Sequence, residues 1–199
     1  YQASFYAKDR RDLEWIARDF VQAGLTDTPP NVLFKKGSKP TFDAYQMHAN
    51  RKTSQTLVDF GCIVGRKVDA DFSIPDWIAD GPQSVKAEFL AALFGAEGNT
   101  PRIANVKLPG TITLAMHKSR PAPRFFEQIG AMLGEFNIRS TVTENISGPD
   151  RIRYAVHVNA TLENRMAFFS QIGYRYAIQK EENTFLWMHY LMAYYHVAA

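Results

Sequence analysis

Residues 83–98 have the sequence QSVKAEFLAALFGAEG, with no helix breaker before Gly95, so we predict a helix over this stretch. Its small residues Ala87, Ala91 and Gly95 are four positions apart and therefore share one face. Because that face lacks bulky side chains, a second helix can approach it closely, and we predict a helix interface there. The alternative is an alanine-rich surface helix. Burial is favoured by the bulky residues on its other sides: Phe89, Leu90, Leu93 and Phe94.

The predicted helix ends at Glu97, with Gly98 in the position of a left-handed cap. A carboxylate at a helix C-terminus faces the negative end of the helix dipole, which costs it a few tenths to about 1 kcal/mol. A bound divalent cation would reverse that sign, and Mg²⁺ is commonly held by one or two carboxylates plus substrate phosphates. Glu97 and the backbone of Gly98 therefore form a candidate metal half-site. A solvent-exposed glutamate is the alternative.

The composition describes a globular chain. Of 199 residues 46% are hydrophobic, and 23 Lys and Arg against 20 Asp and Glu give a net charge of +3, which excludes intrinsic disorder. The single cysteine, Cys62, has no disulfide partner in the chain, so we expect a reducing intracellular compartment and a buried thiol. No apolar run approaches the roughly 18–20 residues that span a bilayer, so we expect no membrane partner.

The chain contains an internal repeat. Residues 44–50 read AYQMHAN and residues 153–159 read RYAVHVN, so Tyr, His and Asn recur at an offset of 109, which is 154 minus 45. The second copy predicts strands at 101–107, 111–118, 139–145 and 151–159. It predicts helices at about 122–135, 161–172 and 181–196. We therefore expect an α+β fold made of two αββαββα copies, divided at 1–79 and 80–199, with the first copy lacking its first helix and strand.

Residues 89–98, FLAALFGAEG, resemble the signature of the LAGLIDADG homing endonucleases, with Glu97 at the metal-binding acid. Residues 60–67, 74–78 and 172–174 also resemble intein-type and archaeal-type members with two repeats. Ala92 and Gly95 depart from the signature. The resemblance implies a pseudo-twofold pair of saddle-shaped antiparallel sheets with helices on their outer faces, in a monomer that forms an internal pseudo-dimer. It implies site-specific cleavage of double-stranded DNA with Mg²⁺ or Mn²⁺, by an enzyme encoded in an intein or intron.

Four lysines match catalytic positions of that family, where they stabilise charge on the cleaved phosphate. Lys8 and Lys118 each stand where a strand enters a helix, and Lys67 and Lys180 each follow the glycine that closes a repeat. Taken singly, each is more often a solvated surface charge. Their occurrence as two repeat-related pairs favours a role in catalysis.

Polar residues alternate with apolar ones along the last strands of the second copy, which predicts a polar sheet face of the kind that reads base edges. Residues 100–159 also hold eight basic against four acidic side chains. An ordinary solvated sheet face is the alternative. The predicted DNA-binding residues are Lys35, Lys36, Lys39, Arg102, Lys107, Thr111, Thr113, Arg139, Thr141, Thr143, Arg151, Arg153, His157 and Asn159.

Two other functions are compatible with the sequence. The first is a cleavage-inactive relative of the same fold, which binds DNA as a regulator or intron RNA as a maturase. The second is a protein-interaction module that docks a partner through the aromatic residues of its C-terminal segment: Phe185, Trp187, Tyr190, Tyr194 and Tyr195.

Overall fold

The computed structural model describes residues 2–39, 43–70, 72–99, 111–119, 121–146, 148 and 151–197, without the side chains of 194–197. The chain forms two compact units. Unit 1 comprises Tyr1–Val64 and Tyr176–Ile178, and unit 2 comprises Gly65–Arg175 and Gln179–Ala199. None of the described helices combines the length and apolarity needed to cross a membrane.

Unit 1 is a three-stranded antiparallel sheet, in the order β1-β3-β2, with helix α1 packed on it. Leu13, Ala17 and Phe20 of α1 meet Met47 and Ala49 in its core. The elements are β1 Ser4–Ala7, α1 Arg10–Gln22, β2 Val32–Lys35, β3 Ala44–His48 and α2 Arg51–Asp59.

Unit 2 repeats this arrangement with the sheet β4-β6-β5, again antiparallel, and adds helices before and after it. Its elements are α3 Asp76–Ala79, α4 Gln83–Glu97, β4 Thr113–Lys118, α5 Pro123–Gly134, β5 Ser140–Ile146, β6 Ile152–Val158, α6 Leu162–Gln171 and α7 Ile178–Val197. Both units thus contain strand, helix, two strands and helix in the same order, which confirms the predicted α+β duplication. The strand predicted at 101–107 lies outside the described residues.

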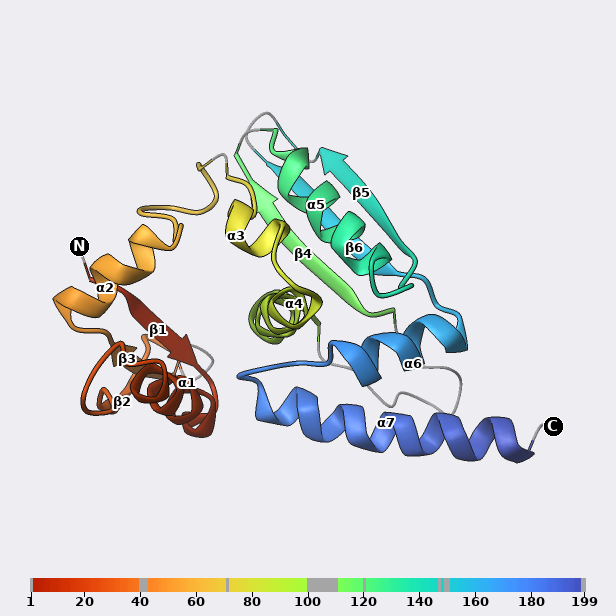
Figure 1. Cartoon of the computed structure of the whole chain (residues 1–199), viewed down its shortest axis with the longest axis horizontal. Helices are drawn as coiled ribbons and strands as arrows, with labels where there is room; N and C mark the ends of the chain where they lie inside the picture. The colour runs from red at the N-terminus through yellow and green to blue at the C-terminus, as the bar shows by residue number, and fades with distance from the viewer. Residues whose placement is uncertain are drawn as a thin grey trace. The chain divides into compact units, whose positions relative to one another are not determined.

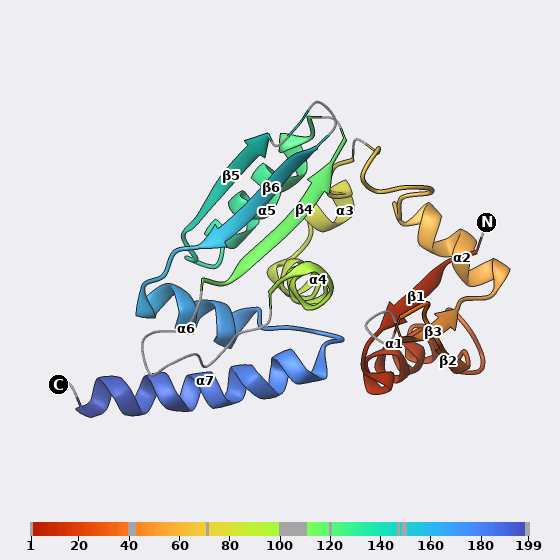
Figure 2. The ribbon, with the colours of Figure 1, turned by 180° about the vertical axis from the view of Figure 1, so that it is seen from behind.

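Helix α5 covers one face of the β4-β6-β5 sheet (Figure 1), and the opposite face is seen from behind with no described helix of unit 2 over it (Figure 2). The covered face is apolar because β6 alternates: Tyr154 and Val156 are buried, whereas Arg153 is exposed. The ring of Tyr154 stacks on Phe126 of α5 with centroids 4.9 Å apart. The alternation predicted for this strand is therefore confirmed.

The boundary between the units falls before residue 65, earlier than the predicted 79/80 division. Residues after Val64 pack on unit 2. Ser119 donates its backbone N–H to the carbonyl of Val68 at 3.0 Å, and Ile74 donates to Oε1 of Gln128 at 2.9 Å. A segment that contains no strand or long helix could not be assigned to its neighbour from local sequence alone.

Candidate active site

The C-terminus of α4 has an unexpected geometry at Gly98. Its φ is −72°, so it does not adopt the left-handed conformation predicted for the cap. Glycine is instead required by space, because a Cβ at this position would lie 2.5 Å from the backbone oxygen of Phe94. Gly98 then pairs with Leu114 in an isolated bridge, which turns the chain from the helix toward β4.

Lys180, in the first turn of α7, caps the end of α4. Its Nζ donates to the backbone oxygens of Gly95 at 2.5 Å, Gly98 at 2.7 Å and Phe94 at 3.2 Å. These carbonyls belong to the end of the helix, where the helix dipole attracts a cation. The Phe94 oxygen also accepts from the backbone N–H of Gly98 at 2.9 Å. The backbone oxygen of Gly98, which the sequence predicts as a metal ligand, already accepts one of these hydrogen bonds.

Lys67 forms an ion pair with the carboxylate of Glu97. The side chain of Glu97 is 29% exposed and that of Lys67 is 52% exposed, so solvent reaches both. Three charged groups, Glu97, Lys67 and Lys180, thus gather around the end of α4. Two cations against one carboxylate give this cluster a net charge of +1, before the partial charge of the helix end is counted.

Lys118 is nearly fully buried, with 3% of its surface exposed. Its Nζ donates to the backbone oxygens of Lys67 and Ala70 and lies 4.4 Å from the centre of the Phe72 ring. The ammonium group therefore holds the segment that carries Lys67. A direct role of Lys118 in catalysis stays a prediction.

Lys8 belongs to unit 1, where it follows β1. Its Nζ donates to the backbone oxygen of Asp43 at 2.5 Å. Of the four predicted lysines, the structure of unit 2 brings Lys67 and Lys180 together with Glu97.

The residues at the end of α4 fit part of a divalent-cation site. Among the described residues no group of three or more His, Cys, Asp and Glu side chains could hold a metal ion. Glu97 offers one carboxylate, and Mg²⁺ prefers six oxygen ligands, several of them from water or substrate phosphates. Unit 2 therefore supplies half a site, which a phosphate-bearing ligand would have to complete.

The stripe of small residues on α4 has a different neighbour from the predicted helix. A Cβ on Gly95 would lie 1.9 Å from the backbone oxygen of Arg175, and the backbone N–H of Arg175 donates to the oxygen of Ala91 at 2.9 Å. Ala91 and Gly95 are buried and Ala87 is half-buried. The irregular segment after α6 thus approaches the backbone of α4 at Gly95, and the predicted partner helix stays a prediction.

The uncovered sheet face of unit 2 is polar. His157 of β6 is hydrogen-bonded through Nδ1 to the hydroxyl of Thr113 at 3.0 Å and through Nε2 to that of Thr143 at 3.1 Å. Thr141 donates to Oδ1 of Asn159 at 3.2 Å. The remaining predicted residues of this unit are exposed: Thr111, Arg139, Arg151 and Arg153. Two others lie outside the described residues: Arg102 and Lys107.

Unit 1 exposes Lys35, Lys36 and Lys39 at and after the end of β2. Sequence reasoning missed a second cluster on this sheet, in which the hydroxyl of Ser4 is hydrogen-bonded to Nδ1 of His48 at 2.8 Å. The signal was available, because His48 is the repeat counterpart of His157.

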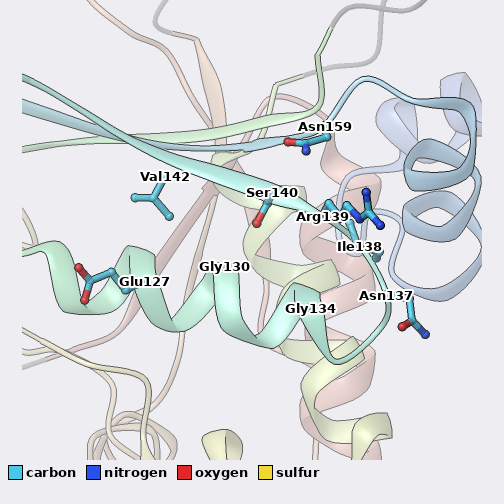
Figure 3. Close-up of a pocket in the computed structure, with 9 residues that line it drawn as sticks. All are labelled: Glu127, Gly130, Gly134, Asn137, Ile138, Arg139, Ser140, Val142 and Asn159. Carbon is cyan, nitrogen blue, oxygen red and sulfur yellow. The ribbon is translucent and has the colours of Figure 1, made fainter.

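A groove of about 810 Å³ runs between α5 and the edge strand β5 (Figure 3). Gly130 and Gly134 of α5 leave it open on one side, and Arg139, Ser140 and Val142 line the other. Neither Glu97 nor its two lysines line this groove. It is therefore separate from the charged cluster at the end of α4.

Residues 84–173 match the family model described as a LAGLIDADG-like domain. This part of the chain is therefore similar to LAGLIDADG-like domains. The matched residues run from α4 to α6, so they include Glu97 and the polar sheet face of unit 2. The resemblance to LAGLIDADG homing endonucleases inferred from the signature is confirmed.

Curated relatives match over most of this chain but over a small part of their own length. The RNA polymerase subunit Rpo1N of Methanocaldococcus jannaschii is 30% identical over 181 residues, covering 86% of this chain and 13% of that protein. The replication factor C small subunit of the same organism is 31% identical, covering 83% and 9%. The tRNA-splicing ligase RtcB of Pyrococcus furiosus is 26% identical, covering 89% and 19%.

Solved structures share the fold of this chain at low identity. The homing endonuclease I-DmoI in complex with DNA and Mn has a TM-score of 0.56 and 15% identity, covering 86% of this chain and 80% of that one. Its complex with DNA and Ca has a TM-score of 0.56 and 12% identity, covering 86% and 74%. I-WcaI, bound to its DNA recognition sequence, has a TM-score of 0.53 and 16% identity, covering 85% and 68%.

Proposed function

We propose that the protein is a homing endonuclease that binds double-stranded DNA at a specific site and hydrolyses its phosphodiester bonds with Mg²⁺ or Mn²⁺. The observation that carries the proposal is the cluster at the end of α4. There Lys67 and Lys180 flank Glu97, inside a LAGLIDADG-like domain whose sheet exposes a polar face. Solved structures of the same fold contain DNA together with Mn or Ca, which supports both the partner and the use of a divalent ion.

The residues of the cluster have distinct roles in this proposal. Glu97 would hold the divalent cation, with the phosphate of the substrate completing its ligands. Such a cation, when bound, neutralises charge on the phosphate and lowers the pKa of a bound water. Lys67 and Lys180 give the site a positive potential that attracts the phosphate and stabilises charge as it develops. Lys118 keeps the Lys67 segment in place through its two backbone hydrogen bonds.

We further propose that this element is encoded within host proteins, as an intein is. The relatives are an RNA polymerase subunit, a replication factor subunit and a tRNA ligase, which have different activities. A segment common to all three cannot be what performs any one of these activities. An insertion with its own function accounts for the small share of each relative that the match covers.

The test is cleavage of a library of plasmids with a randomised insert, incubated with the purified chain in MgCl₂. We expect linear plasmids whose ends share one sequence, and no linear product in EDTA. Cleavage without sequence preference, or cleavage that survives EDTA, would contradict the proposal.

The alternative, a cleavage-inactive DNA- or intron-RNA-binding relative, is supported by the same polar face but needs no metal. It predicts recovery of one bound sequence from the library with no cut in MgCl₂. The other alternative is a protein-interaction module that docks a partner through aromatic residues of the C-terminal segment. Trp187 does not fit that function, because it is 2% exposed and belongs to the core of unit 2. Phe185, which is 65% exposed, stays available to a partner.

A further inference from the structure

The ring of His157 has both nitrogens engaged by side chains of the two neighbouring strands. Nδ1 meets the hydroxyl of Thr113 on β4, and Nε2 meets that of Thr143 on β5. An imidazole ring has no other polar atoms. His157 therefore ties the three strands of this sheet together across its polar face and has no ring nitrogen left for a base edge.

In unit 1 the repeat counterpart His48 joins β3 to β1 only, because its second ring nitrogen meets Gln46 of its own strand. Nδ1 of His48 is hydrogen-bonded to the hydroxyl of Ser4 on β1 at 2.8 Å, and its Nε2 contacts the side-chain amide of Gln46. Ser4 pairs with His48 in the sheet register, as Thr113 pairs with His157. Thr113 lies 109 positions after Ser4, and His157 lies 109 positions after His48, so the two pairs are repeat counterparts.

We propose that His48 and His157 are positioning residues for DNA recognition, which orient hydroxyl groups on the two sheet faces rather than contacting bases themselves. The inference rests on the proposed DNA-binding function. A hydroxyl both donates and accepts and rotates freely, so by itself it does not discriminate one base edge from another. The hydroxyls of Thr113 and Thr143 each have a backbone carbonyl within reach besides the ring nitrogen, at 3.4 and 3.5 Å. Their protons are therefore engaged within the sheet, which leaves each hydroxyl to accept from a base and removes part of the entropy cost of binding.

The experiment is a double-mutant cycle on DNA affinity. The probe is the duplex that the wild-type protein selects from a random double-stranded library, with Ca²⁺ present in place of Mg²⁺. The variants are His157→Ala, Thr143→Val and the double variant. We expect each single variant to bind about three- to tenfold more weakly, and the double variant to bind no more than about twofold more weakly than the worse single one.

Matched controls distinguish a positioning role of His157 from a general loss of folding or of DNA contacts. His117→Ala removes an exposed histidine from the same face, on β4, and its effect should multiply with that of Thr143→Val. Thr143→Ser keeps the hydroxyl and should bind like the wild type. Melting temperatures of all variants confirm that the fold persists, and in unit 1 Ser4→Ala with His48→Ala repeats the cycle.

If the affinity losses of His157→Ala and Thr143→Val multiply in the double variant, the inference is overturned. Such a result would show that the ring acts on DNA independently of the hydroxyl. A ring ¹⁵N spectrum of His157 that Thr143→Val leaves unchanged in the free protein would also overturn it. If the wild type selects no duplex at all, the proposed DNA-binding function fails, and the inference fails with it.

Discussion

Lys180 places one ammonium group on three backbone oxygens at the end of α4. Its replacement by Met keeps the length of the side chain but leaves those carbonyls without this donor, so we expect the free energy of unfolding to fall by about 1–3 kcal/mol. Urea denaturation measures the change. The matched variant is Lys67→Met, which removes an ion pair open to solvent and should cost about 0–1 kcal/mol. Equal losses for the two variants would contradict this assignment of roles.

Asp9 caps the N-terminus of α1, where it accepts a hydrogen bond from the backbone N–H of Arg11 at 2.9 Å. The hydrogen bond to the Arg11 side chain holds the pKa of Asp9 below its ordinary value of 3.8. A carboxyl whose pKa is lower in the folded than in the unfolded protein stabilises the fold at pH values above its unfolded pKa. That stabilisation is lost as the pH falls through the pKa of the folded state.

Asp9→Ala should therefore reduce the free energy of unfolding by about 1 kcal/mol at pH 7 and by progressively less below about pH 4. Urea denaturation at pH 7, 5 and 3 tests the sign. A difference from wild type that grows toward pH 3 would be inconsistent with a stabilising carboxylate.

The stability of α4 depends on Gly95 more than the helix propensity of glycine indicates. Ala at this position would gain about 1 kcal/mol of propensity, but its Cβ would lie 1.9 Å from the Arg175 oxygen, so we expect a net loss of about 1–3 kcal/mol. Gly134, the last residue of α5, has open space around its Cβ position. Gly134→Ala should therefore be neutral or slightly stabilising by the same measurement.

The sequence predicted elements better than contacts. The extent of α4 follows from its lack of helix breakers before Gly95, and that of α5 follows from apolar periodicity. The polar and apolar faces of β6 follow from alternation, and all three patterns are local. The neighbour of Gly95 and the cap on α4 come from Arg175 and Lys180, about 80 positions along the chain. Local sequence patterns do not predict contacts between residues so far apart in the chain.

Two smaller errors have the same origin. Gly98 looked like a left-handed cap because glycine after a helix usually is one, whereas here the crowding by Phe94 requires it. Cys62 was expected to be buried and is exposed, because the chain after α2 leaves regular structure at this point. In both cases the tertiary surroundings decided what residue type alone could not.

At the scale of the whole molecule, a net charge of +3 understates the potential of the polar sheet face, which carries Arg153 while α5 covers the opposite side. Arg153→Gln should weaken DNA binding and reduce the slope of log affinity against log salt by about 1. The matched variant is Arg124→Gln, an equal loss of charge on α5, which should leave that slope unchanged. Fluorescence anisotropy over a salt series distinguishes them.

Glu97→Gln tests whether the end of α4 is the active site, because this nearly isosteric change removes the carboxylate there. On the duplex that the wild type selects, with Mg²⁺ present, we predict that cleavage falls by at least about 100-fold while affinity changes by less than about threefold. Glu88→Gln is the control, since it removes a carboxylate from the same helix that is paired with Arg175. Cleavage by Glu97→Gln at the wild-type rate would contradict the assignment of this helix end as the active site.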